Sequence, residues 1–321
     1  MNALELNRRA LELCDAMERQ ADELRVRVSL TSAVSRIIDC GVEAPGGIAA
    51  GLGMARICLA GLADVSIVPG RTDLWPGPAV QVRTDHPVAA CMASQYAGWQ
   101  LSAGKFFAMG SGPMRAVAGK ETLFADIGQR EIAKQVVGVL ETSKLPSEEV
   151  CAQIAADCGV TADHVTLLAA RTASMAGTLQ VVARSVETAL HKLHTLGFDL
   201  SRVQTGYGVA PLPPIGQDDL TAIGWTNDSV LYGGEVTLWV RGDDDSLAAI
   251  GPRIPSVESG DYGEPFAVIF ERYQRDFYKI DPLLFSPAQV SLVNLDTGRV
   301  HRFGDVNAAV LQESFAATGG H

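Results

Sequence analysis

The chain has 321 residues, of which 47% are hydrophobic and 20% are charged. This composition excludes a disordered or coiled-coil protein, and the length predicts one large lobe or two ordinary ones. Thirty-seven acidic residues against 26 Lys plus Arg give a net charge of −11. Because nucleic-acid binding depends on clustered cations and the sequence has no basic run, we expect no nucleic-acid partner.

Six cysteines stand singly along the chain, at positions 14, 40, 58, 91, 151 and 158. None forms a CxxC pair, which excludes a zinc ribbon and a thioredoxin motif. Unpaired cysteines among apolar neighbours are typical of a reducing compartment. The N-terminal MNALELNRRALELCDAMERQ is too polar for a secretory signal. We therefore expect a cytoplasmic protein.

Residues 48–68 match a membrane span in length, and Arg56 and Asp64 are their only charged residues. Each of these charges would cost about 2.5–3.5 kcal/mol near the centre of a bilayer. The segment is also rich in Ala and Gly rather than Leu. We therefore predict a buried soluble segment and no membrane partner.

The hydrophobic pattern up to residue 205 predicts alternating helices and strands. Helices are expected at 3–25, 88–101, 129–141, 147–158 and 174–196; strands are expected at 26–30, at short apolar runs within 40–80, and at 165–170. The segment 102–116 is predicted to be a loop. Alternation of the two element types indicates an α/β or mixed α+β fold.

A Pro- and Gly-rich stretch, GYGVAPLPPIG (206–216), is the best candidate for a domain boundary. Beyond it we predict strands at 230–240 and 247–251, a helix near 264–275 and a strand–turn–strand at 289–303. The resulting division is a first lobe at 1–205 with most of the candidate catalytic residues, a second lobe at 206–315, and a disordered tail at 316–321.

Two glycine motifs, GLGMAR (51–56) and GSGPMR (110–115), begin like a dinucleotide-binding fingerprint. Both carry arginine where the third glycine should allow close helix–strand packing, so we do not predict a Rossmann site. Gly110, Ser111 and Gly112 could still present backbone N–H groups to a ligand. A purely structural turn explains them equally well.

The predicted helix 174–196 has an apolar face made of Met175, Leu179, Val182, Val186, Ala189, Leu190 and Leu193. A separate stripe of polar side chains follows from the same periodicity: Gln180, Arg184, Glu187, His191 and His194. Lys192 points away from this stripe. A solvated helix face usually carries Lys and Glu, whereas this mixture is more typical of a functional cleft.

Two chemistries could use the stripe. Glu187, His191 and His194 stand at i, i+4 and i+7, the spacing of three metal ligands on one helix face, which would make a metal-dependent hydrolase. No HExxH or HxH motif accompanies them. Alternatively, Arg184 keeps Glu187 ionised, and the carboxylate takes a proton from an attacking water.

Several strings, in order along the chain, carry a resemblance to a known family. They are GKFFAMGSGPMR (104–115), ARSVETALHKLH (183–194), YGGEV (232–236), DYGEPF (261–266) and DFYKIDPLLFSPAQVSLVN (276–294). Together they resemble the methenyltetrahydromethanopterin cyclohydrolases of one-carbon metabolism, over a region that ends near residue 303.

The resemblance implies an enzyme that interconverts the 5,10-methenyl cation of tetrahydromethanopterin, with water, and the N5-formyl derivative. It implies no required metal or redox cofactor, with tetrahydromethanopterin or its dephospho form as the one-carbon carrier and substrate. It further implies two α/β lobes with interleaved segments, a large cleft between them, and a homotrimer. The Pro-rich stretch near 210 would then be a crossing between lobes.

By motif, the resemblance assigns catalytic roles to Glu187, Arg184 and Lys105. Lys105 could tune the carboxylate, contact the pterin or formyl oxygen, bind an anionic side chain of the substrate, or be a solvated loop residue. Candidate substrate contacts are Gly110, Ser111, Gly112, Glu235 and His191. Turn geometry is the alternative for the glycine segment, and a salt bridge at a strand end is the alternative for Glu235. A non-catalytic pterin-binding protein also remains open.

Overall fold

The structure, a computed structural model, describes residues 4–316 apart from the side chain of Tyr278. The chain divides into two compact units. Unit 1 is built from the chain up to Ala63 and from Ala89–Gln180, and unit 2 from Asp64–Val88 and the chain from Val181 onward. Each unit is thus assembled from two separate stretches of sequence. The predicted tail beyond residue 316 lies outside the described residues.

Unit 1 contains a six-stranded sheet within its described residues, in the order β1-β2-β8-β7-β6-β5. Its strands are β1 (Arg27–Leu30), β2 (Arg36–Gly41), β5 (Trp99–Ala103), β6 (Phe106–Ser111), β7 (Val136–Glu141) and β8 (Val165–Ala170). Its helices are α1 (Leu6–Arg19), α2 (Ala21–Leu24), α3 (Ile48–Cys58), the π-helix η1 (Val88–Gln95), α4 (Met114–Ala118), α5 (Leu123–Ile127) and α6 (Glu148–Cys158). The central strands β2, β8 and β7 are parallel. β1 pairs antiparallel with β2, β6 pairs antiparallel with β7, and the edge strand β5 pairs antiparallel with β6.

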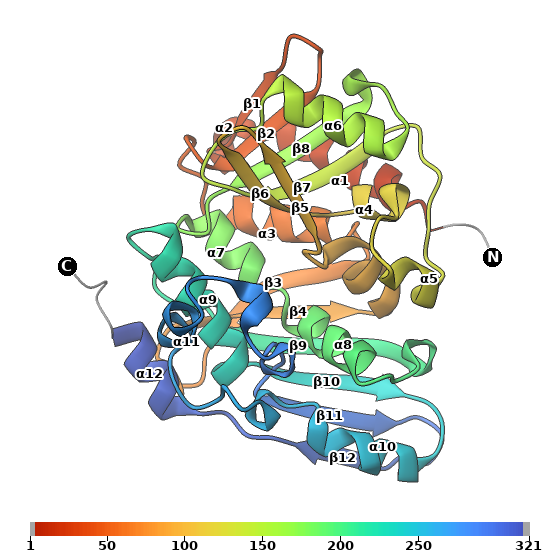
Figure 1. Ribbon diagram of the computed structural model, residues 1–321, viewed down its shortest axis with the longest axis vertical. Helices are drawn as coiled ribbons and strands as arrows, with labels where there is room; N and C mark the ends of the chain where they lie inside the picture. The colour runs from red at the N-terminus through yellow and green to blue at the C-terminus, as the bar shows by residue number, and fades with distance from the viewer. Residues whose placement is uncertain (1–3, 317–321) are drawn as a thin grey trace. The chain divides into compact units, whose positions relative to one another are not determined.

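The core of unit 1 lies on both faces of this sheet. On β7, Val137 and Val139 pack with α1 and α3, whereas Val136 and Leu140 pack with α4 and α6. Alternate residues of a strand point to opposite faces, so a parallel strand covered on both sides is apolar throughout. Figure 1 shows these strands in the middle of unit 1.

Unit 2 also contains a six-stranded sheet within its described residues, in the order β12-β11-β10-β9-β4-β3. Its strands are β3 (Ala63–Pro69), β4 (Pro78–Thr84), β9 (Val203–Pro211), β10 (Glu235–Val240), β11 (Gln289–Asn294) and β12 (Val300–Phe303). Its helices are α8 (Ser185–Thr195), α9 (Asp219–Gly233), α10 (Asp244–Ile250), α11 (Phe266–Arg272) and α12 (Ala308–Ala316). Helix α8 lies across β4, β9 and β10 (Figure 1), and α9, α11 and α12 share an aromatic core.

Several predicted elements are confirmed: the strands at 26–30 and 165–170, the helices at 147–158 and 264–275, and the strand pair at 289–303. The segment 129–141 is wrong as a helix, because its second half is strand β7, paired on both edges. The predicted loop 102–116 contains most of the β5–β6 hairpin. The predicted strand 247–251 belongs to α10, which Asp243 caps by accepting the backbone N–H of Ser246 at 2.7 Å.

The boundary predicted at residue 206 falls inside unit 2. GYGVAP is the end of β9, which pairs with β4 on one edge and β10 on the other. The chain passes from one unit to the other between residues 63 and 64, between 88 and 89, and, for the last time, between 180 and 181. The membrane-length stretch 48–68 forms α3 and most of β3. Among residues 4–316, no helix is both long enough and apolar enough to cross a membrane.

Candidate functional site

Glu187 stands in the first turn of a helix. The predicted single helix 174–196 is broken: α7 (Met175–Val182) ends, Ala183 and Arg184 form a turn, and α8 begins at Ser185. The N–H of Arg184 bonds back to the oxygen of Val181, three residues earlier, at 3.1 Å. Arg184 is therefore the N-cap of α8, and Glu187 is its third residue. The positive end of the helix dipole favours a negatively charged carboxylate at this position.

Two glycines of β9 hold that first turn against the sheet. A Cβ at Gly208 would lie 2.5 Å from Oγ of Ser185, and one at Gly206 would lie 2.7 Å from Cγ1 of Val186. Only a residue without a side chain allows α8 to approach β9 this closely. The GYG sequence (206–208), predicted to lie in a boundary loop, is therefore the part of β9 against which Ser185 and Val186 pack.

The polar stripe predicted for this helix is not a solvated face. Arg184 is 7% exposed and Glu187 is 4% exposed, and both make interactions with other groups. Charged side chains are seldom buried without partners, because removing a charge from water is costly. The solvated alternative is therefore wrong for Arg184 and Glu187, and the functional interpretation of the stripe stays a prediction. The apolar positions Leu179, Val182, Val186, Ala189, Leu190 and Leu193 are buried as predicted.

His191 follows Glu187 by one helical turn and is uncharged at neutral pH. Burial, together with the nearby charges of His194 and Lys192, lowers the pKa of His191 to about 4. A neutral imidazole can donate one hydrogen bond and accept another, which suits contact with a heterocycle. His191 therefore adds no positive charge beside the carboxylate of Glu187.

The alternative metal centre is not formed. Glu187, His191 and His194 share α8, yet among the described residues no three His, Cys, Asp or Glu side chains are grouped so that they could hold a metal ion. Spacing along a helix brings side chains to one face, but a metal also requires their donor atoms to converge on one point. The structure therefore does not support the metal-dependent reading of the stripe.

The glycine segment of unit 1 is part of that unit's core. Ser111 is 1% exposed; its Oγ donates to the oxygen of Val139 at 3.2 Å and lies 3.3 Å from Sγ of Cys58. Gly112 adopts a φ of +91°, and its N–H bonds to the oxygen of Ser94 at 2.8 Å. Gly110 is also buried. These partners favour the structural-turn reading of Gly110, Ser111 and Gly112.

Lys105 lies at the other end of the same strand. Gly104 and Lys105 form the exposed turn of the β5–β6 hairpin, between the paired residues Ala103 and Phe106. A strand rises about 3.3 Å per residue, so Lys105 is roughly 16 Å from Gly110. The structure therefore separates these two predicted site elements, and the exposure of Lys105 agrees with a solvated turn lysine.

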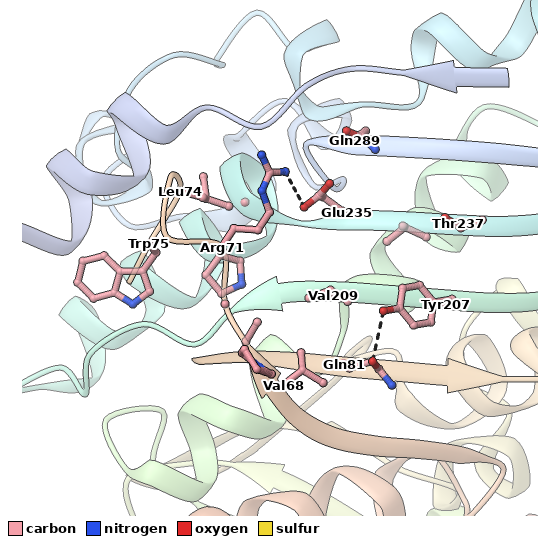
Figure 2. Close-up of a pocket in the computed structure, with 16 residues that line it drawn as sticks. Val68, Arg71, Leu74, Trp75, Gln81, Tyr207, Val209, Glu235, Thr237 and Gln289 are labelled. Atoms are coloured by element: carbon pink, nitrogen blue, oxygen red, sulfur yellow. Dashed lines mark hydrogen bonds and ion pairs between the residues drawn. The ribbon is translucent and has the colours of Figure 1, made fainter. Parts of the chain in front are cut away.

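Glu235 lines a cavity on the face of the unit 2 sheet turned away from α8. Gly206 and Gly208 face α8, so Tyr207 and Val209 of β9 face the opposite way, and both line a cavity of about 460 Å³. Glu235 lines the same cavity and accepts a hydrogen bond from Arg71 Nη1 at 3.0 Å (Figure 2). The sheet thus stands between Glu235 and Glu187, and the salt-bridge alternative for Glu235 is observed.

Lys192 is the residue whose importance the sequence did not reveal. The helical periodicity placed it away from the polar stripe and assigned it no role, and its side chain is fully buried. Its Nζ donates a hydrogen bond to the backbone oxygen of Leu283. Two features of the sequence could have indicated this burial. One is a lysine among apolar positions of the helix; the other is IDPLLFSP (280–287), which is part of one of the strings that carried the resemblance.

Comparison with known proteins gives a consistent result. The family model described as "Cyclohydrolase (MCH)" matches residues 5–315. A methenyltetrahydromethanopterin cyclohydrolase of Rhodopirellula baltica is 45% identical over 97% of this chain and 95% of its own length. Relatives of the same name from Xanthobacter autotrophicus and Methanococcoides burtonii are 48% and 38% identical, over 94% and 97% of this chain and 90% and 98% of their own lengths. The chain therefore belongs to the MCH cyclohydrolase family.

Proposed function

We propose that this protein is a methenyltetrahydromethanopterin cyclohydrolase in which Glu187 is the general base. Named relatives at 38–48% identity over nearly the whole chain support the substrate and the reaction. The observation that carries the role of Glu187 is its place in the first turn of α8, buried and beside the N-terminal end of the helix dipole.

The chemistry of the reaction explains why one carboxylate can be sufficient. The methenyl carbon lies between two nitrogens that share a positive charge, so it is already electrophilic. Glu187 accepts a proton from water as the oxygen bonds to this carbon. The bond to one nitrogen then breaks, that nitrogen takes up a proton, and the hydroxyl of the intermediate loses one to become the formyl group. One proton is released overall, and the negative charge of Glu187 also favours binding of the cation.

Arg184 and His191 complete the proposed site on α8. Arg184 precedes Glu187 by three residues, a spacing at which side chains on a helix can meet. We assign Arg184 to orienting Glu187 and keeping it ionised, because a guanidinium aimed at a cationic substrate would oppose binding. His191, neutral and one turn later, is a proposed hydrogen-bonding contact for the pterin. A catalytic role for Lys105 is supported by the resemblance alone.

The test is Glu187→Gln, which keeps the shape of the side chain and removes its basicity. We expect kcat to fall about 10²- to 10⁴-fold, measured as loss of the methenyl absorbance, with thermal stability close to that of the wild type. Glu271→Gln, an exposed glutamate of α11, is the matched control and should keep full activity. Wild-type kcat in Glu187→Gln would refute the general base.

Three further parts of the proposal rest on the family likeness: no metal or redox cofactor is required, the protein is a homotrimer, and it acts in the cytoplasm. The first is checked in the same assay, since wild-type activity should survive exhaustive chelation.

A further inference from the structure

Lys192 lies in a hydrogen-bonded site on the side of α8 away from Glu187. Five residues separate the two, which is about 140° around the helix axis and about 7.5 Å along it. The Nζ of Lys192 donates to the backbone oxygen of Leu283, in the 3-10 turn η7 (Pro282–Leu284). The carboxylate of Asp281 accepts the N–H of the same Leu283 at 3.0 Å. The peptide groups of Leu283 are thus fixed at both ends by charged side chains.

Asp281 is itself held by a second layer of hydrogen bonds. Its Oδ2 accepts from Oγ of Ser259 at 2.7 Å, and its backbone N–H donates to Asp261 at 3.0 Å. Asp261 in turn accepts from the hydroxyl of Tyr273 at 2.9 Å. We call Lys192, Leu283, Asp281, Ser259 and Asp261 the Lys192 network. It ties α8 to the segment 259–284, which contains one of the strings that carried the family resemblance, DYGEPF, and the first part of another, DFYKIDPLLFSPAQVSLVN.

The charges of the network are coupled. Burial alone would raise the pKa of Asp281, but hydrogen bonds from Ser259, Leu283 and Gly260 and the charge of Lys192 bring it below its usual range. Burial lowers the pKa of Lys192, the charges of Asp281 and Glu258 raise it and that of Arg253 lowers it, with a net result of about 8. On its own helix, Lys192 also acts on His191. Lys192 thus stays protonated up to about pH 8.

We propose that Lys192 is a positioning residue for Glu187, which it aims by fixing the rotation of α8 about its axis. On one side, β9 holds the first turn of α8 at Gly206 and Gly208. On the other side, the Lys192 network holds the last part of the helix. Rotation would pull the ammonium away from its oxygen partner and leave a buried charge unpaired, which is costly. This inference rests on the proposed role of Glu187.

The geometry makes catalysis sensitive to this anchor. A carboxylate lies about 5–6 Å from the helix axis, so a rotation of about 10° moves it by about 1 Å. A displacement of about 1 Å at the reacting atoms can cost a factor of about 100 in rate. A small relaxation of α8 therefore lowers kcat before it disturbs the fold or the affinity for a large substrate.

The test compares Lys192→Met and Lys192→Arg in the full-length protein, with activity measured as loss of the methenyl absorbance. We expect Lys192→Met to lower kcat about 10- to 100-fold with KM within about threefold of the wild type, and Lys192→Arg, which keeps the charge, to recover at least part of kcat. Wild-type kcat should fall above about pH 8 as Lys192 loses its proton, and this fall should be absent from Lys192→Met. If Lys192→Met does not fold, Asp281→Asn probes the same anchor from its other end, with the same split of kcat and KM expected.

Two controls keep the outcomes distinct. Asp228→Ala removes another buried ionisable group of unit 2, one that contacts α11 and α12. If it loses as much kcat as Lys192→Met at a matched melting temperature, Lys192 acts only on stability and the proposal is overturned. Glu187→Gln separates the two proposals: if it is inactive while Lys192→Met keeps wild-type kcat, only the role of Lys192 is refuted. If Glu187→Gln is fully active, the general base is refuted, and the role of Lys192 with it.

Discussion

At the scale of single residues, Asp228 is the carboxylate whose environment has the clearest consequence for stability. It is completely buried on α9, where it accepts the N–H of Phe266 at the start of α11 and the hydroxyl of Ser314 on α12, at 2.8 and 2.5 Å. Burial raises the pKa of Asp228, and because the two hydrogen bonds only partly offset this, the pKa is about 7. Asp228 thus links α9, α11 and α12, and its protonated form predominates below about pH 7.

The sign of the pH dependence follows from that raised pKa. The folded protein holds the proton of Asp228 up to about pH 7, whereas the unfolded chain loses it near pH 4. The resulting stabilisation is present below pH 4 and is lost as the pH rises through 7. Asp228→Asn removes this titration. We expect the free energy of unfolding of the wild type, minus that of Asp228→Asn, to fall by roughly 4 kcal/mol from pH 4 to pH 8.

Urea unfolding of both proteins across that pH range measures this difference, because other titrations cancel between them. A difference that does not change with pH would show that Asp228 is ionised in the folded protein.

At the scale of elements, the contact of α8 with β9 decides where Glu187 lies. We expect Gly208→Ala to push Ser185 and the first turn of α8 outward, because the new Cβ would lie 2.5 Å from Oγ of Ser185. Overpacking of this kind costs about 1–3 kcal/mol. We expect kcat to fall at least about tenfold, since the catalytic carboxylate moves with the turn. Steady-state kinetics and thermal unfolding of the variant measure both effects.

Two variants serve as controls for Gly208→Ala. The buried Oγ of Ser185 has no hydrogen-bond partner among the described residues, so Ser185→Ala removes the shortest of the new contacts without breaking a bond. The double variant should therefore regain activity. Gly260→Ala, where a Cβ would meet nothing within 4 Å, should behave as the wild type. Failure of the double variant to recover would show that the first turn of α8 is not what Gly208 positions.

At the scale of the whole molecule, the path of the chain determines which fragments can fold by themselves. Unit 1 takes the chain up to Ala63 and Ala89–Gln180, while β4, between them, pairs with β9 of unit 2 in the register Ala79 with Pro211. A fragment ending at residue 205 would keep β4 and α8 but lose most of β9 and the other strands that follow in unit 2. It would expose the apolar face of α8.

We therefore expect a fragment of residues 1–205 to aggregate on expression, because ending the chain at residue 205 divides the sheet of unit 2 within β9 and exposes strand edges. A chain in which residues 1–63 are joined to 89–180 by a short flexible linker contains every strand of the unit 1 sheet and should unfold cooperatively. Circular dichroism and light scattering on the two chains measure the outcome. A soluble, cooperative 1–205 fragment would contradict the division at residues 180 and 181.

Local patterns in the sequence were sufficient for much of the fold. The strands at 26–30 and 165–170 and the helix at 147–158 follow from periodicity. The Val-rich run 136–141 was misread because a buried parallel strand is apolar on both faces, so it lacks the alternation that marks an exposed strand. Asp243, a helix cap in the acidic run before 247–251, was a signal that could have corrected that strand.

For the site, the sequence by itself determined two things. Its strings carry the family resemblance, and the spacing of Arg184, Glu187 and His191 places them about one helical turn apart. Only the tertiary structure decided that α8 begins at Ser185, that Lys192 is buried against Leu283, and that Glu235 faces the opposite side of the sheet. The reason is physical. A helix break, the burial of a charge and the face of a strand depend on what packs against them, and those partners come from segments far away in the chain.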